Sequence, residues 1–410
     1  MSNKGQRGKQ TQLPLFTLFV ASAISYVGDY FTLIAIPWFV LSTTGSVTKT
    51  GITALFSTLP SVLSAFFGST LVDRLGYKRT SVISDSASAI SVALIPLLYS
   101  TVGLAFWQLL ALVFLGGLLK SPGATARIAL LPELVEAAQM RLERANAIND
   151  GVSRVSRFIG APLAAVLITI IGTSNLLWLD GASFAISALL IGLLIPVALV
   201  RTEVVGKVNR SYWEDLVSGM RFIRRDSLIL TIVTVIFVTN LLDAAFFSVI
   251  EPAYIKQVFH SAIPLGLISA ALGGAGFVGA IIFGAIGYRL PRRLTFGIAY
   301  IIGGALRFWV FLVPILPILL LTHIIAGLAI GAINPLIDTI TFERIPKEMR
   351  ARVFGTITAG AFVGVPLGTV SSGYVAAQLG LRTTIIIMGA VYLLTTLSLL
   401  VNPALKTMDT

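Results

Sequence analysis

Long apolar stretches separated by short polar interruptions run along nearly the whole chain. Each stretch is long enough to cross a bilayer, which takes about 20 apolar residues. Because strict alternation of apolar and polar residues is missing, the stretches predict helices rather than the strands of a barrel. Twelve spanning helices are expected, at about residues 13–42, 47–70, 80–100, 103–126, 147–172, 175–200, 228–256, 263–288, 293–313, 315–340, 350–379 and 382–402.

The polar interruption Ser69–Thr80 separates the second and third of these stretches. It gathers Asp73, Arg74, Lys78 and Arg79 within a few residues, and Gly76 supplies the backbone freedom that a tight turn needs. A charged turn between two spans lies in water or among headgroups, and its excess of positive charge indicates the cytoplasmic side.

The composition agrees with this pattern. Of the 410 residues 56% are hydrophobic and only 12% are charged, against about 25% charged in a soluble domain. An integral membrane protein is therefore expected. Cysteine is absent, and the two histidines, His260 and His323, lie far apart. Neither a metal site nor a cofactor is expected, and no constellation of nucleophile and base points to an enzyme.

The net charge of +12 is unevenly distributed along the chain. With the N-terminus placed inside, 23 of the 30 Lys and Arg residues, Arg127 among them, fall in cytoplasmic segments and only 3 in outer loops. This asymmetry follows the positive-inside rule and explains the charge without a nucleic-acid partner. It predicts a multi-pass protein of a bacterial-type inner (cell) membrane with both termini in the cytoplasm.

The longest polar stretch lies near the middle of the chain. Its apolar residues recur at helical spacing between charges, which predicts an amphipathic helix on the inner membrane surface. The expected organisation is an N-terminal six-helix bundle (1–200), a cytoplasmic amphipathic linker (201–226) and a C-terminal six-helix bundle (227–410).

The two halves align with each other. Asp29 corresponds to Asp243, Pro122 to Pro335, and Gly160-Ala-Pro162 to Gly364-Val-Pro366, at offsets between 204 and 214 residues. An internal duplication predicts two pseudo-symmetric bundles, an arrangement suited to alternating access around a central site.

The interruption at Ser69–Thr80 resembles the signature of the major facilitator superfamily between spans two and three, Gly-x-Leu-Ala-Asp-Arg-x-Gly-Arg-Lys. Leu71, Asp73, Arg74, Gly76 and Lys78 match, whereas Ser69, Val72 and Tyr77 depart from it. Further stretches, such as Leu130-Leu-Pro-Glu133, are similar to its twelve-span drug and siderophore exporters. The Arg-x-x-x-Gly motif that many antiporters carry in span four is absent; Lys120 is the nearest basic group.

This resemblance implies a helical secondary transporter that exports amphipathic small molecules such as drugs, macrolides or siderophores. It also implies that spans one and seven line a central cavity. Asp73 would close the inner side by docking near the start of span eleven, where Arg352 lies. The expected cytoplasmic gate consists of Asp73, Arg74, Gly76, Lys78 and Arg352.

Ionisable groups inside spans cost about 2.5–3.5 kcal/mol on insertion scales and are functional by default. Asp29 and Asp243 are the leading candidates for proton coupling or cation binding. The alternative is that they form structural ion pairs with Lys120 or Arg307; Arg307 has no other predicted role. The residues expected to serve proton coupling or to line the cavity are Asp29, Lys120, Asn240, Asp243, Phe247, Glu251, His323, Asn334 and Asp338.

Three functional hypotheses follow. The first is a proton-coupled exporter whose partners are its small-molecule substrate, protons and membrane lipids, and which acts as a monomer. The second is a lysophospholipid flippase, with Lys120 or Arg157 contacting the headgroup. The third, a membrane sensor or scaffold that transports nothing, is disfavoured because no sizeable soluble segment is present.

Overall fold

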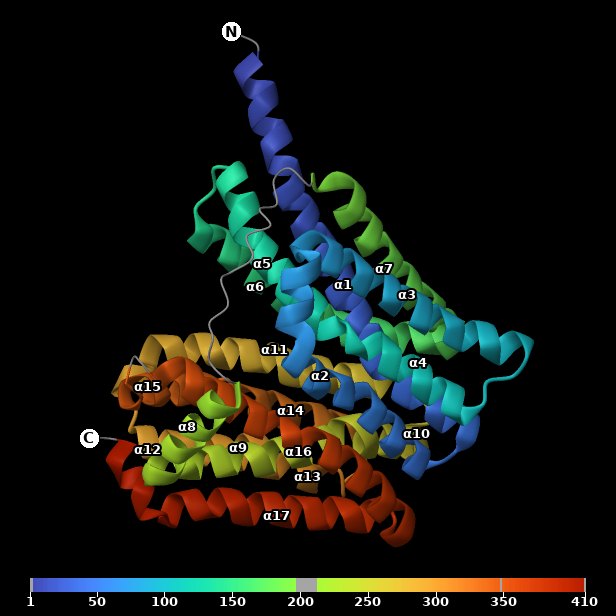
Figure 1. The fold of residues 1–410 in the computed structure, drawn as a ribbon. Coiled ribbons are helices and arrows are strands. Elements are labelled where there is room, and N and C mark those ends of the chain that lie inside the picture. Colours follow the sequence, from blue (N-terminus) through green and yellow to red (C-terminus); the bar gives the residue numbers. More distant parts are fainter. Residues whose placement is uncertain (1–2, 197–211, 347–348, 409–410) are drawn as a thin grey trace. The chain divides into compact units, whose positions relative to one another are not determined.

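The computed structural model describes residues 3–196, 212–346 and 349–408 (Figure 1). Over these residues the chain consists of helices and short turns. It divides into two compact units: unit 1 comprises residues 1–42 and 56–207, and unit 2 comprises residues 43–55 and 208–410. The start of the second helix therefore groups with the second half of the chain. The predicted domain boundaries, including the linker at 201–226, stay a prediction.

The first half of the chain is built from long helices joined by tight turns. Within unit 1, α3 and α7 lie side by side, and α3 also packs against α4 and α5 (Figure 1). The bounds are α1 (Asn3–Thr44), α2 (Val47–Leu75), α3 (Tyr77–Thr101), α4 (Phe106–Leu118), α5 (Lys120–Ala137), α6 (Leu142–Ile171) and α7 (Thr173–Leu194).

The second half is more interrupted. Its helices include two short π-helical turns, η2 and η4, in which the backbone hydrogen bonds reach five residues instead of four. The bounds are α8 (Tyr212–Arg225), α9 (Ser227–Ala245), η2 (Phe246–Ile250), α10 (Glu251–Phe259), α11 (Ile263–Ile286), η3 (Gly287–Arg289), α12 (Arg292–Tyr300), η4 (Ile301–Ala305), α13 (Leu306–Val310), α14 (Leu316–Ile330), α15 (Ile333–Arg344), α16 (Arg350–Leu379), α17 (Leu381–Val401) and η6 (Pro403–Met408).

Among the described residues, 10 helical stretches are long and apolar enough to cross a membrane. Two further stretches coincide with the remaining predicted spans. They are α2, and the run from α12 through η4 to α13, which one π-helical turn interrupts. The predicted all-helical membrane fold is thus confirmed. Residues 120–137, however, form a helix that continues the fourth span well beyond residue 126, so Arg127 lies in that helix and not in a loop.

The duplication is visible in the backbone. Gly172 joins α6 to α7 with φ 82° and ψ 162°, and Gly380 joins α16 to α17 with φ 80° and ψ 159°. In both turns the glycine N–H closes the preceding helix and its carbonyl accepts the first bond of the next one. Only glycine adopts these angles readily, so the two halves use the same device at corresponding places. Gly76, with φ 78°, makes the expected tight turn before α3.

The central amphipathic helix α8 packs within unit 2. Ile223 is 1% exposed and belongs to a small core with Ile229, Ile345 and Val353, whereas Val217 is 53% exposed. Part of the apolar face of α8 is therefore covered by α9 and α16. Its predicted position on the inner membrane surface stays a prediction.

Glycines allow α11 and α14 to meet backbone to backbone within unit 2. A Cβ on Gly327 would overlap the Leu272 carbonyl and Gly276, and a Cβ on Gly279 would overlap the backbone of Leu328. No side chain fits between the two helices at these points, so their axes approach as closely as the backbones permit.

Candidate functional site

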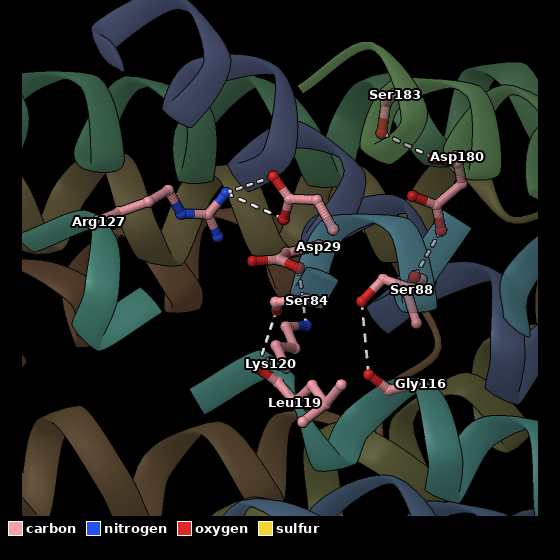
Figure 2. A network of polar contacts seen from close by, with 11 residues as sticks. Asp29, Ser84, Ser88, Gly116, Leu119, Lys120, Arg127, Asp180 and Ser183 are labelled. Carbon is pink, nitrogen blue, oxygen red and sulfur yellow. Dashed lines mark hydrogen bonds and ion pairs between the residues drawn. The ribbon is translucent and has the colours of Figure 1, made fainter. Parts of the chain in front are cut away.

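An ion pair lies within the predicted spans of unit 1. The ammonium Nζ of Lys120 lies 2.8 Å from Oδ1 of Asp29, and the two side chains are 44% and 24% exposed, respectively (Figure 2). This is one of the two structural ion pairs that the sequence offered as an alternative role for the candidate aspartates. Charged groups at this depth avoid hydrocarbon and face protein or a water-filled cavity.

A break in the fourth span positions Lys120. Helix α4 ends at Leu118 and α5 begins at Lys120, just before Pro122, which has no N–H to donate to the Leu118 carbonyl; the Leu119 carbonyl still accepts the Gly123 N–H at 2.9 Å. The Ser84 hydroxyl donates to the Leu119 carbonyl at 2.8 Å, and the Ser88 hydroxyl donates to the Gly116 carbonyl at 3.4 Å (Figure 2). The serines of α3 thereby hold the turn from which Lys120 reaches Asp29.

A second, fully buried ion pair lies nearby in unit 1, and sequence reasoning missed it. One guanidinium nitrogen of Arg127 lies 3.1 Å from each carboxylate oxygen of Asp85, and the Ser187 hydroxyl donates to the same carboxylate at 2.6 Å. The side chains are 5% and 3% exposed. The assignment of Arg127 to a cytoplasmic loop is therefore wrong. The signal was available, because Asp85 is an acid within an apolar stretch.

Asp180 on α7 is a third acid within the spans of unit 1, and sequence reasoning missed it as well. It is 0% exposed and accepts a hydrogen bond from the Thr32 hydroxyl, while its Oδ1 has no partner within the described protein. Thr32 lies three residues after Asp29 on α1, and Gly28 brings α1 close to Asp180 and Ser183. A polar cluster thus surrounds the middle of α1 (Figure 2).

Unit 2 holds the other predicted pair. Arg307 on α13 donates to Asp243 on α9, and its side chain is 2% exposed while that of Asp243 is 29% exposed. The guanidinium also lies 4.6 Å from the ring centre of Phe247, 5.3 Å from that of Phe308 and 5.8 Å from that of Tyr392. Aromatic faces attract cations, so Arg307 has both an ionic and an aromatic reason to lie inside this unit.

Two further predicted site residues are buried in the same unit. Glu251 is 1% exposed, and its Oε1 has no hydrogen-bond partner within the described protein. His323 is 0% exposed, its Nδ1 lies 2.7 Å from the Leu319 carbonyl, and its ring meets Phe311 edge to face. Nδ1 therefore carries the proton that bonds the carbonyl, and Nε2 is left as an acceptor with no hydrogen-bond partner in the part of the chain that the structure describes.

The remaining predicted cavity residues have different surroundings. Asn240 is half-buried, whereas Asn334 and Asp338 are exposed on α15. A turn after Gly331 separates α15 from α14, which carries His323. The structure therefore does not bring His323 onto a common open face with Asn334 and Asp338.

The predicted cytoplasmic gate is only partly described. The side chains of Asp73 and Arg74 lie outside the described residues, whereas Lys78 and Arg352 are half-buried. The docking of Asp73 near Arg352 stays a prediction. Among the residues that the structure describes, no group of three or more His, Asp or Glu side chains could hold a metal ion.

Each unit thus pairs one of the two predicted aspartates with a cation; Asp29 and Asp243 correspond in the internal repeat, whereas Lys120 and Arg307 come from the fourth and the ninth predicted spans. Long apolar helices that hold charged pairs among them define a multi-pass membrane protein with a polar interior, an arrangement typical of transporters. The sequence matches the Major Facilitator Superfamily over residues 18–246 and 233–407, and the chain belongs to that family.

Within this family, the chain is similar to several named transporters. The chain is 29% identical over 404 residues to the multidrug efflux pump Tap of Mycolicibacterium fortuitum, covering 97% of each protein. It is 20% identical over 397 residues to macrolide efflux protein A of Streptococcus pyogenes, covering 92% of this chain and 93% of that protein. The solved structure of the nucleoside transporter NupG matches with a TM-score of 0.77 at 14% identity, over 95% of this chain and 98% of that one. At this identity the structural match shows the fold alone.

Proposed function

We propose that this protein is a proton-coupled exporter of amphipathic small molecules in the bacterial cell membrane. It works as a monomer by alternating access, with both termini in the cytoplasm. The names of the relatives, a multidrug efflux pump and a macrolide efflux protein, support an exported drug-like substrate. The matching backbone turns at Gly172 and Gly380 support two equivalent bundles.

The observation that carries the proposal is the Asp29–Lys120 pair. Both side chains keep part of their surface exposed, unlike the buried Asp85–Arg127 pair, and we take this exposure as the route by which a proton reaches the carboxylate. While Asp29 is ionised it holds Lys120; when Asp29 takes up a proton, the attraction is lost and the ammonium group is released. Because the two forms of Asp29 differ in what they bind, proton binding shifts the balance between conformations of the transporter.

The experiment compares Asp29→Asn with wild type in proteoliposomes loaded with a fluorescent lipophilic cation. The asparagine has the shape of a protonated aspartic acid and cannot release a proton. We expect transport driven by a pH gradient to be lost, while exchange of substrate for substrate across the membrane persists. Glu143→Gln serves as the control, because Glu143 lies exposed at the start of α6. Full gradient-driven transport by Asp29→Asn would contradict the proposal.

The two cations that a flippase would use for a lipid headgroup both have partners. Lys120 pairs with Asp29, and Nε of Arg157 donates to the Tyr30 hydroxyl at 2.9 Å. No observation therefore favours the lysophospholipid alternative. The same proteoliposomes decide the matter, because a flippase would move a labelled lysolipid and leave the cation in place. A sensor or scaffold would move neither.

Closure of the inner side belongs to the same proposal. The expected gate consists of Asp73, Arg74, Gly76, Lys78 and Arg352. The second half of the repeat has Tyr288 at the position of Asp73, so only the first half supplies this acid. A helix N-terminus attracts an anion by about 0.3–2 kcal/mol, and α16 begins at Arg350. That attraction is the physical basis on which we propose that Asp73 stabilises the outward-open state.

A further inference from the structure

The π-helical turn η2 changes which side chains share a face of the seventh span. In a regular helix each residue turns by about 100°, so Glu251, eight residues after Asp243, would lie about 80° away around the axis. A π-helical turn accommodates one extra residue, and the offset falls to about 20°. The turn Phe246–Ile250 lies between the two acids. It therefore brings both carboxyl groups onto one face of the helix.

Arg307 is the cation that serves this face. Its guanidinium is bonded to Asp243, its Nε has no hydrogen-bond partner within the described protein, and it also acts electrostatically on Glu251. A second π-helical turn, Ile301–Ala305, directly precedes α13, where Arg307 lies. Within that turn a Cβ on Gly304 would overlap the ring of Tyr392. The glycine thus lets Tyr392 pack beside the guanidinium.

Among the residues that the structure describes, Arg307 is the only charge found to act on either acid, while Arg382 acts on the nearby Tyr254. The titratable side chains that pack around it are Tyr254 on α10, Tyr300 on α12, His323 on α14 and Tyr392 on α17. The Tyr300 hydroxyl is hydrogen-bonded to Thr239, and His323 is neutral because only Nδ1 has an acceptor. Helix α11 carries no titratable residue. One permanent cation therefore faces two acids.

This charge count is unfavourable unless one acid is neutral. Arginine stays protonated in proteins, so two ionised carboxylates would leave one net negative charge in a cluster in which Glu251 and Arg307 are buried. An uncompensated buried charge is costly, whereas a neutral group of three is tolerated. Asp243 pairs with Arg307, whereas Oε1 of Glu251 has no hydrogen-bond partner within the described protein, so the neutral form suits Glu251 better than Asp243.

We propose that Asp243 and Glu251 hold one proton between them, and that Arg307 changes its partner from Asp243 to Glu251 when the proton moves to Asp243. In that step an O–H bond of Glu251 breaks and an O–H bond of Asp243 forms. The guanidinium moves to the newly ionised carboxylate, and the net charge of the cluster stays unchanged. The inference deepens the proposed function, because it adds to Asp29 a second proton site in the other unit. Arg307 is then a positioning residue that couples two acids.

Infrared spectroscopy of the purified protein tests this without any substrate. The C=O stretch of a protonated carboxyl group is separate from that of a carboxylate, and a difference spectrum against Glu251→Gln isolates the signal of Glu251. We expect wild type to show a protonated Glu251 at neutral pH. In Asp243→Asn, Arg307 loses its partner, so Glu251 should ionise and its protonated signal should be lost. A protonated signal that survives in Asp243→Asn would overturn the proposal.

Thermal unfolding supplies a second readout. Asp243→Asn and Glu251→Gln each leave Arg307 one carboxylate, so each should shift the melting temperature only slightly. The double variant leaves the guanidinium buried without a counterion and should shift it by far more than the sum of the two. Adding Arg307→Met to the double variant should restore much of the loss, which shows that the fold survives. Additive shifts would contradict a shared cation.

Glu343→Gln is the matched control for these variants. Glu343 also pairs with an arginine, Arg292, but both side chains are substantially exposed. Its loss should change neither the protonated carboxyl signal nor the coupling between Asp243 and Glu251. Because these measurements use no gradient and no substrate, they can fail while Asp29 still couples transport to protons, or succeed if Asp29 does not.

Discussion

Replacing Asp85 by alanine leaves the guanidinium of Arg127 inside unit 1 with no counterion. The side chain of Arg127 is 5% exposed, so water cannot take the place of the carboxylate. Removing one partner of a buried ion pair costs about 3–5 kcal/mol. The Ser187 hydroxyl loses its acceptor as well, which adds about 1 kcal/mol. At about 2–4 °C for each kcal/mol in a body of this size, the melting temperature should fall by very roughly 10 °C or more.

The pair should be dispensable when both members are replaced. Apolar side chains of similar volume often match or exceed a buried ion pair in stability. We therefore expect Asp85→Leu combined with Arg127→Met to recover most of the loss seen in Asp85→Ala. The assay is thermal unfolding of the purified protein in detergent, followed by tryptophan fluorescence. Gradient-driven transport should persist in the double variant, because this pair is structural.

An exposed ion pair provides the reference. Arg292 and Glu343 are 36% and 54% exposed, and pairs of this kind contribute about 0–1 kcal/mol. Glu343→Ala should therefore leave the melting temperature nearly unchanged. If Asp85→Ala behaves like Glu343→Ala, burial of the Asp85–Arg127 pair does not determine its energy and the reasoning is refuted. A double variant as unstable as Asp85→Ala would refute the structural role.

Three further predictions concern turns, packing and the gate. Gly172→Ala and Gly380→Ala should each lower the free energy of chemical unfolding by about 1–3 kcal/mol, because their backbone angles suit only glycine. Gly273→Ala is the control and should not destabilise, since Gly273 lies in a helix with open space around it. Unequal losses for Gly172→Ala and Gly380→Ala would argue against the equivalence of the two turns. Ile223→Ala should cost about 2–5 kcal/mol, since the side chain is buried; a cost below about 0.5 kcal/mol would show that α8 does not pack there. Asp73→Asn should raise the inward-open population in distances measured between spin labels on the inner side, and no shift would argue against the proposed latch.

Hydropathy predicted the helices well because the bilayer requires length and apolarity from each span. What it could not predict was irregularity inside the spans. The break at Leu119 and the π-helical turn at Phe246–Ile250 leave no mark in hydropathy, but a proline follows each of them, Pro122 and Pro252, and a proline has no N–H for the carbonyl four residues earlier. Both interruptions lie next to site residues, Lys120 in one case and Glu251 in the other.

The ion pairs of the site were partly foreseen. The sequence singled out Asp29 and Asp243 as acids inside spans and offered Lys120 and Arg307 as their partners, and the structure shows both pairs. It could not assign the partners, because pairing depends on which faces of four helices meet. Arg307 had no role on its own, since its aromatic neighbours come from three separate elements.

Two buried acids and one arginine of unit 1 were not predicted as part of the site. Asp85 and Asp180 lie inside apolar stretches just as Asp29 does, but not in the first or seventh span, the two that the family resemblance places around a central cavity. Arg127 was misplaced because a basic residue near the predicted end of a span was counted as a loop residue. Charge alone cannot distinguish a cation at the membrane surface from one whose counterion lies on the next helix.

The glycine contacts between α11 and α14 have a mechanical consequence. With no side chains between the backbones at Gly279 and Gly327, this seam has no rotamers to rearrange, so one helix cannot slide past the other in small steps. We therefore expect the two helices to move together as one rigid body within unit 2. A deformation of this unit is then expected where regular helical hydrogen bonding is interrupted, as it is at the π-helical turns Phe246–Ile250 and Ile301–Ala305. Asp243, Glu251 and Arg307 lie next to these two turns, so a deformation of either turn would change the distances between the charged groups of the cluster.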